Sequence, residues 1–257
     1  MIVVGDTTLA EIMPVLEKHF GDWTGPADAP QTPAVPAVAL PTKPRVFLVD
    51  QPGASQSNIY VGQVVPSTMD PQAIEFDIAN SVLGGEFSSR LNMNLREDKH
   101  WAYGSYSWTS GARGQRPWMA YAAVQTDKTA ESMAELKREV EQYATGERPA
   151  SAEEVEKIRA VEIRSLPGAY ETAGAVMGAI GGIVRFERPD DYVVQRKAKI
   201  EALTPEQVNA MARTIDPDAL TWVVVGDLKQ IEDKVRALNL GDVQVVDTDG
   251  NPVGAAD

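Results

Sequence analysis

The chain has 257 residues, of which 43% are hydrophobic and 24% charged, a mixture typical of a globular protein with one large domain or two small ones. It contains no cysteine, which excludes disulfide bonds, a thiol nucleophile and a thiolate zinc site. Its formal net charge of −13 opposes binding to phosphate backbones and anionic lipids, so we expect no nucleic-acid partner.

A short repeat relates the amino terminus to the far end of the chain. Residues 2–6 read Ile-Val-Val-Gly-Asp and residues 223–227 read Val-Val-Val-Gly-Asp, and each run is followed by an amphipathic stretch and a second Gly-Asp. The pattern predicts a buried β run, a turn and a short helix that occur twice, about 220 residues apart. We therefore interpret residues 1–24 as the tail of a preceding homologous domain.

A proline-rich stretch follows this tail. Residues 25–44 contain six prolines, a density that blocks helices and sheet ladders and favours an extended spacer. We interpret 25–44 as a Pro/Ala-rich linker, 45–250 as the main domain and 251–257 as a C-terminal tail.

The main domain opens with two β-rich runs. Arg45–Gln51 and Gln56–Val65 are separated by a Pro-Gly turn, which predicts a hairpin. A helix from Pro71 to Leu83, with Asp70 as its cap, is predicted to end at Gly84-Gly85. A second helix over 87–98 and two strands over 101–109 and 118–125 are predicted next.

The second part of the domain is mostly helical in pattern. Asp127 is predicted to cap a helix that ends at Gly146, and Ser151 begins a capping box for the next helical region. That region is predicted to break near Pro167-Gly168 and again at Gly181-Gly182. The remaining predicted elements are a helix capped at 204–206, the repeated strand-helix unit, and a last strand over 243–247.

Hairpins set among helices predict an α+β fold with a mostly antiparallel sheet covered by helices. The longest uncharged apolar-rich stretch, Thr172–Val184, has thirteen residues, against the ~20 that a membrane-spanning helix needs. We therefore expect no membrane span.

The candidates for metal or nucleophilic chemistry are few. The two histidines, His19 and His100, are far apart, whereas a helical zinc site needs two histidines one turn apart on one face. Each lone histidine is more often structural than a ligand. We therefore expect that the chain itself binds no metal.

Potentially functional side chains are densest in the segment from Leu83 to Ser107. Arg96 at the end of a predicted helix and Tyr103 at the start of the next strand can reach one cleft and donate hydrogen bonds to a peptide carbonyl or its oxyanion. The simpler alternative pairs Arg96 with the neighbouring Glu97 or Asp98 and leaves Tyr103 as ordinary sheet surface.

The same segment resembles the second half of insulinase/pitrilysin zinc peptidases. Their pattern of Gly-Gly-x-x-Ser-Ser-Arg-Leu, Leu-Arg-Glu and Ala-Tyr is present at 84–91, 95–97 and 102–103, and looser similarity covers about 45–250. The resemblance implies an α+β half that closes with a zinc-bearing half around a peptide substrate. In it, Arg96 and Tyr103 are the substrate-binding residues, and the His-x-x-Glu-His zinc motif belongs to the partner half, in the same longer chain or a separate subunit.

By this resemblance the chain is the zinc-less part of a metalloendopeptidase and hydrolyses nothing alone. The alternative is a non-catalytic scaffold or assembly subunit with the same fold. The intact Arg/Tyr pair favours the peptidase. The sequence leaves the compartment, periplasm or cytoplasm, open.

Overall fold

The protein is described by a computed structural model that covers residues 1–25, 28 and 35–253. Its centre is a six-stranded sheet in the order β3-β4-β2-β5-β1-β6, in which β1 pairs in parallel with β5 and β6 and the other neighbours are antiparallel. The predicted α+β fold with a mostly antiparallel sheet is therefore confirmed. The strands are β1 (Arg45–Asp50), β2 (Gln56–Val65), β3 (Ala102–Thr109), β4 (Arg116–Gln125), β5 (Thr221–Gly226) and β6 (Asp242–Val246).

The predicted hairpin between the first two strands is wrong, although both strands exist. β5 lies between them, so that Val223 is opposite Phe47 on one side and Tyr60 on the other. The Pro-Gly turn at 52–53 reverses the chain across a gap one strand wide. A local turn signal cannot show that a valine-rich strand from the far end of the chain fills that gap.

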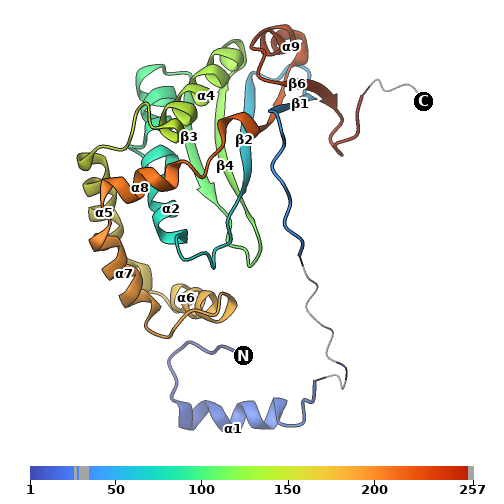
Figure 1. The fold of residues 1–257 in the computed structure, drawn as a ribbon. Helices are drawn as coiled ribbons and strands as arrows, with labels where there is room; N and C mark the ends of the chain where they lie inside the picture. Colours follow the sequence, from blue (N-terminus) through green and yellow to red (C-terminus); the bar gives the residue numbers. More distant parts are fainter. Residues whose placement is uncertain (26–27, 29–34, 254–257) are drawn as a thin grey trace.

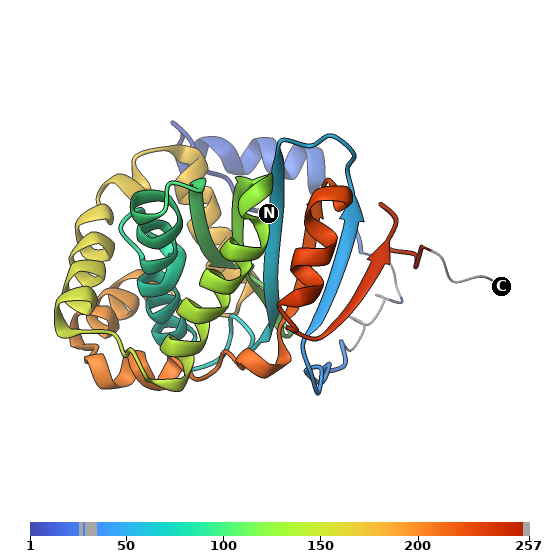
Figure 2. The same cartoon turned by 90° about the horizontal axis from the view of Figure 1, so that it is seen from above.

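The helices lie mainly on one face of the sheet, with α2, α4 and α9 side by side in Figure 2. Side chains such as Leu48, Ile59 and Trp222 point into this layer and are buried. Alternate residues face the other side, the open face, where Tyr60 and Tyr106 are 37% and 39% exposed. The helices are α1 (Leu9–Phe20), α2 (Ala73–Asn80), α3 (Arg90–Asn92), α4 (Thr129–Thr145), α5 (Ala152–Ser165), α6 (Ala173–Arg185), α7 (Tyr192–Ala202), α8 (Pro205–Ala212) and α9 (Leu228–Ala237).

Helix ends follow the local sequence signals in most places. The capping boxes that begin at Ser151 and Thr204 are present, and Gly146 ends α4 with a φ of 80°. Asp127 is not a cap, because it lies inside a 3₁₀ turn that precedes α4. The predicted break at Gly181-Gly182 is also wrong, since α6 continues through it to Arg185; glycine costs only about 1 kcal/mol in a helix interior.

In the amino-terminal segment the helix of the repeat forms, but the strand does not. α1 begins with a capping box at Thr8 and has no buried residue, and residues 2–4, predicted as a buried β run, form no strand. The equivalent strand in the repeat, β5, has neighbours on both edges. α1 lies at the lower end of the molecule near α6 (Figure 1), and Ile12, Leu16 and Ile180 line a hollow that both helices share.

The predicted linker is described only in part, because residues 26–27 and 29–34 lie outside the described residues. Its last part passes along the open side of the sheet (Figure 1), where the Gln115 side chain bonds both the N–H and the C=O of Val38. Of the predicted tail, residues 254–257 are also outside the described part. The division into tail, linker and main domain stays a prediction.

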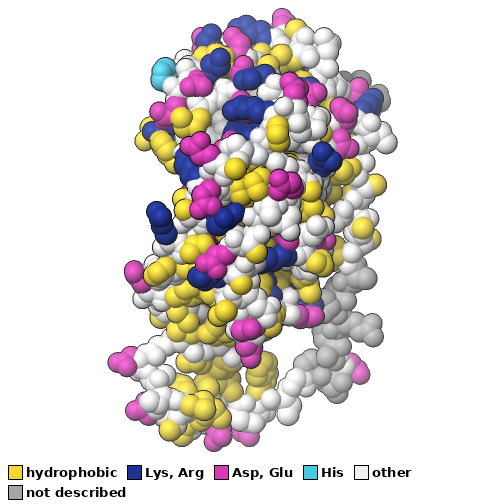
Figure 3. Space-filling view, turned by 60° about the vertical axis from the view of Figure 1, so that its left-hand side comes forward, with side chains coloured by type: hydrophobic (Ala, Val, Ile, Leu, Met, Phe, Trp, Pro, Cys, Tyr) yellow, Lys and Arg dark blue, Asp and Glu magenta, His cyan; other side chains and the backbone are white. Residues whose placement is uncertain are grey.

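Charges of both signs are intermixed over the face shown in Figure 3, and hydrophobic side chains gather toward its lower end. Within the described chain, no helix combines the length and the apolar character that crossing a membrane requires.

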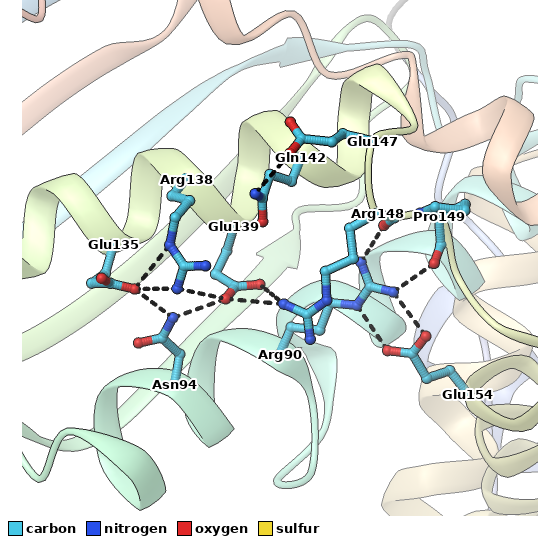
Figure 4. Close-up of polar contacts among 10 residues, drawn as sticks. All are labelled: Arg90, Asn94, Glu135, Arg138, Glu139, Gln142, Glu147, Arg148, Pro149 and Glu154. Atoms are coloured by element: carbon cyan, nitrogen blue, oxygen red, sulfur yellow. Dashed lines mark hydrogen bonds and ion pairs between the residues drawn. The ribbon is translucent and has the colours of Figure 1, made fainter.

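A buried arginine ties α3 to the loop between α4 and α5 (Figure 4). Arg90 donates to both carboxylate oxygens of Glu154 at 2.8 Å and to the carbonyls of Arg148 at 2.6 Å and Pro149 at 2.9 Å. Its Cζ lies 4.9 Å from the centroid of the Tyr143 ring. Four hydrogen bonds and a ring contact therefore engage this guanidinium inside the protein, which makes Arg90 a structural residue.

A second buried charge continues the network. Glu139 accepts from Arg148 at 2.9 Å and from Asn94 Nδ2 at 2.8 Å, and Asn94 also donates to Glu135. The two networks fix the segment from 90 to 94 against α4 and α5. Burial raises the pKa of the Glu154 carboxyl, but hydrogen bonds from Arg90 and Ser151 outweigh it, so that this pKa lies below its ordinary value.

We predict that Arg90→Ala lowers the free energy of unfolding by about 3 kcal/mol, because it leaves a partly buried carboxylate and two carbonyls without their donor. Since the folded pKa of Glu154 is lowered, the difference from wild type should be full above the unfolded pKa of about 4.3 and shrink as the pH falls below it. Urea unfolding at pH 7 and pH 3.5 measures both effects. The exposed Arg164→Ala should change stability by less than about 0.5 kcal/mol; equal effects of the two substitutions would refute the role of Arg90.

Candidate functional site

The site segment lies close against the sheet because a helix approaches β3 without a side chain between them. After α2 the chain continues as a π-helical turn, Ser81–Gly85. A Cβ on Gly84 would lie 2.4 Å from Ser107 Oγ, so only glycine fits there. The buried Asn80 joins the same layers: its Oδ1 accepts from Ser107 Oγ at 2.7 Å and from Trp118 Nε1 at 2.8 Å.

A second buried amide fixes the next turn. Asn92, fully buried in α3, donates through Nδ2 to the carbonyl of Phe87 at 2.6 Å. Its Oδ1 accepts from the Ser105 N–H at 3.2 Å. One side chain therefore holds both the segment that precedes α3 and the strand β3 that follows it.

The chain turns from helix into strand at His100. Met93–Asp98 is again π-helical, a form frequent at functional sites, and Arg96 lies in it. His100 adopts a φ of 57°, which is uncommon for a residue with a side chain. Its Nδ1 lies 3.0 Å from the carbonyl of Arg96, and the Trp101 N–H donates to the Leu95 carbonyl at 3.0 Å. His100 therefore contacts the backbone of the corner, which is a structural role.

An irregularity in β3 sets the direction of Tyr103. Ala102 is opposite Val124 and Ser105 is opposite Ala122, so β3 has one residue more than β4 over this stretch. Such a bulge resets the alternation of side chains. As a result Ala102 and Ser105 both face the helices, and Tyr103 points to the open face, where it is 83% exposed.

Arg96 and Tyr103 are in contact. The Cζ of Arg96 lies 5.3 Å from the centroid of the Tyr103 ring and 4.7 Å from that of Phe87, so the guanidinium contacts two aromatic rings. Its Nε is also 3.2 Å from Glu97 Oε1. Arg96 therefore pairs with its neighbour Glu97, as the simpler alternative predicts, and also contacts Tyr103.

The described residues do not form a metal site. Among residues 1–25, 28 and 35–253, no three histidine, cysteine, aspartate or glutamate side chains are grouped so as to hold a metal ion. The carboxylates of α2 are engaged elsewhere, Glu75 with Lys199 at 2.9 Å and Asp77 with Arg116 at 2.9 Å. A resident zinc ion does not fit these residues, so we assign this chain no step through zinc.

Sequence reasoning missed two residues of this site. Phe87 stacks on Arg96 from nine positions earlier, and Asn92 holds the backbone on both sides. The sequence signal that could have identified Asn92 was an asparagine within the helix predicted over 87–98. Nothing in the spacing of Phe87 distinguishes it from a core residue.

The fold and this cluster define an α+β domain in which a partly exposed cation and an exposed phenol lie beside the open sheet face. Comparisons with known proteins agree with that description. A family model described as the peptidase M16 inactive domain matches residues 1–161. A zinc protease of Streptomyces coelicolor is 26% identical over 219 residues, which are 85% of this chain and 47% of that protein.

Solved structures show the same fold. A protease from Helicobacter pylori superposes with a TM-score of 0.77 at 17% identity, over 87% of this chain and 53% of that one. The peptidase M16 inactive domain from Pseudomonas fluorescens gives a TM-score of 0.65 at 22% identity, over 77% and 47%. The chain thus spans about half the length of these relatives.

Because the family model covers more than half of the residues, the chain belongs to the peptidase M16 family, that of insulinase and pitrilysin. It matches the inactive domain of that family of zinc proteases. The resemblance read from 84–91, 95–97 and 102–103 is confirmed.

We predict that Asn92→Leu destabilises the protein by about 1–3 kcal/mol, since the buried N–H of Ser105 and the carbonyl of Phe87 lose their partner while the number of side-chain heavy atoms is kept. Chemical denaturation measures the change. Asn251→Leu, which removes only an exposed contact to Asp247, is the matched control and should stay within about 0.5 kcal/mol. A loss no larger than that of the control would show that Asn92 does not hold the corner.

Proposed function

We propose that Arg96 and Tyr103 hold the backbone of a peptide substrate in a zinc endopeptidase whose zinc is bound by another, homologous half. The observation that carries this proposal is the contact between the two side chains, 5.3 Å from Cζ to ring centroid, on the open side of a family M16 inactive domain. Both groups donate hydrogen bonds, and a peptide carbonyl or its oxyanion accepts them.

The contacts of Arg96 suit this role. Phe87 and Tyr103 lie within cation–π distance of its guanidinium, an attraction to the ring that involves no hydrogen-bond acceptor. These contacts restrict the position of Arg96, and a guanidinium has five N–H donors, so donors are left for a ligand. Tyr103 is 83% exposed, so its hydroxyl is accessible to a ligand on the open face.

The sheet face without a helical layer supports the presence of a partner half. Helices cover one side of the sheet, and the chain spans about half the length of its relatives, one of which is a zinc protease. We infer that a zinc-bearing half, in the same longer chain or as a separate subunit, closes over the open face. The alternative, a non-catalytic assembly subunit, gives no role to an exposed tyrosine held against a guanidinium.

In the complete protein, Arg96→Ala and Tyr103→Phe should each lower kcat/KM for a peptide substrate, by about 10² for the arginine and less for the tyrosine. The reason is the loss of donors that face the reacting carbonyl. Zinc content, measured on the same samples, should stay at the wild-type value, because neither residue is assigned to the metal.

Arg164→Ala and Tyr170→Phe, the same residue types on α5 and on the following turn, are the controls and should retain wild-type activity. Full activity of both site variants would remove Arg96 and Tyr103 from the substrate site.

A separate experiment tests the assignment of zinc binding to the other half. The 257-residue chain alone should contain no stoichiometric zinc and cleave no peptide, and both properties should appear when the zinc-bearing half is added. Metal analysis and peptide hydrolysis before and after mixing measure this. Zinc-dependent cleavage by the isolated chain would contradict the proposal.

A further inference from the structure

The open face carries a row of tyrosines at one level of the sheet. Tyr106 of β3 is opposite Tyr121 of β4, which is opposite Tyr60 of β2. Directly opposite residues of paired strands point to the same side, so the three rings lie side by side. Val223 of β5 continues the row beyond Tyr60.

The rings of this row are held in place. The Tyr60 and Tyr121 centroids are 4.8 Å apart with the planes tilted by 40°, a favourable aromatic arrangement. The Tyr121 hydroxyl donates to Asn58 Oδ1 at 2.7 Å. Tyr60 keeps 37% of its surface exposed, so a fixed aromatic surface is presented to the open side.

Tyr106 places one end of the row beside Gly104, the residue that follows Tyr103. A Cβ on Gly104 would lie 2.6 Å from both Cε2 and the hydroxyl of Tyr106, so this ring lies directly over the glycine that follows Tyr103. The extra residue in β3 puts Tyr103 and Tyr106 on the same face. Without it the two side chains would point to opposite sides, and the row would be separated from the pair.

A hollow of about 290 Å³ adjoins the other end of the row, and Tyr60 is part of its wall together with Val223, Gly62 and Met119. This is near the lower limit for ligand pockets, which suits one large apolar side chain better than a whole small molecule.

The kind of ligand that fits here is indicated by the chain itself. Residues 38–41, Val-Ala-Leu-Pro, form another wall of the hollow, and the Gln115 amide bonds Val38 through its N–H at 2.6 Å and its C=O at 3.0 Å. An extended apolar peptide thus already lies along the open face, recognised through its backbone.

We propose that the tyrosine row, Tyr106, Tyr121 and Tyr60, together with the adjoining hollow, selects peptide substrates that carry an aromatic side chain away from the cleaved bond. The proposal rests on the proposed function, because the peptide backbone is taken to be held by Arg96 and Tyr103. Tyr60 is the specificity-determining residue, since it belongs to both the row and the hollow. A ring on the peptide stacks on Tyr60 and leaves water.

Binding of two fluorescein-labelled nine-residue peptides to the 257-residue chain tests this. Both are alanine-based with one lysine for solubility, and they differ only in Phe or Ala at position 7. Fluorescence anisotropy should show the Phe peptide bound about 3- to 10-fold more tightly by the wild type, as expected for one aromatic contact. Tyr60→Leu should abolish this preference by lowering the affinity for the Phe peptide.

Tyr170→Leu, a tyrosine equally exposed at 37% but outside the row, should keep the preference. Far-UV circular dichroism checks that the variants are folded, and Tyr60→Phe, which keeps the ring, should retain the preference as well. Arg96→Ala should weaken both peptides equally.

The outcomes distinguish a failure of the tyrosine row from a failure of the proposed function. Equal binding of the two peptides by the wild type, with both sensitive to Arg96→Ala, overturns the tyrosine row and leaves the proposed function standing. A preference that survives Tyr60→Leu also overturns the row. Absence of binding by either peptide overturns both.

Discussion

The side-chain amide of Asn92 holds the backbone around the site, accepting from the Ser105 N–H in β3 and donating to the carbonyl of Phe87. Between Ala102 and Ser105, β3 has one residue more than β4, and this extra residue turns Tyr103 to the open face. Phe87 supplies a second ring in contact with Arg96. The orientation of a cation and a phenol thus depends on a neutral, buried hydrogen-bonding group, whose loss would leave buried polar atoms unpaired.

The two arginines of the motif lie in different environments. Arg90 is enclosed by Glu154, two carbonyls and the Tyr143 ring, so it fixes the helices and presents nothing to a ligand. Arg96, six positions later, is partly exposed and contacts two aromatic rings. The same chemical group therefore stabilises the fold in one place and remains available for hydrogen bonding in the other, because burial differs.

Much of the fold could be predicted from the sequence, and the failures in strand pairing and register share a cause. Capping boxes at Ser151 and Thr204, the glycine end of α4 and the β-rich runs are local signals, and the structure confirms them. The pairing of β1 with β5 is not local, and the predicted hairpin was wrong for that reason. The bulge beside Tyr103 likewise appears only in the register between β3 and β4.

At the site, the resemblance to the insulinase/pitrilysin pattern selected Arg96 and Tyr103, and the structure places the two side chains in contact. Their roles remain proposals. Phe87 and the tyrosine row could not be predicted, because stacking and cross-strand alignment depend on which residues the folded sheet places at one level.

The most direct test of the central claim is a double-mutant cycle on kcat/KM in the complete protein, with Arg96→Met, Tyr103→Leu and the double variant. If the pair holds one peptide carbonyl as a unit, the double variant should lose little more than the worse single variant, because each residue depends on the other for its orientation. Strictly additive losses would show that the two side chains act independently and would contradict the account.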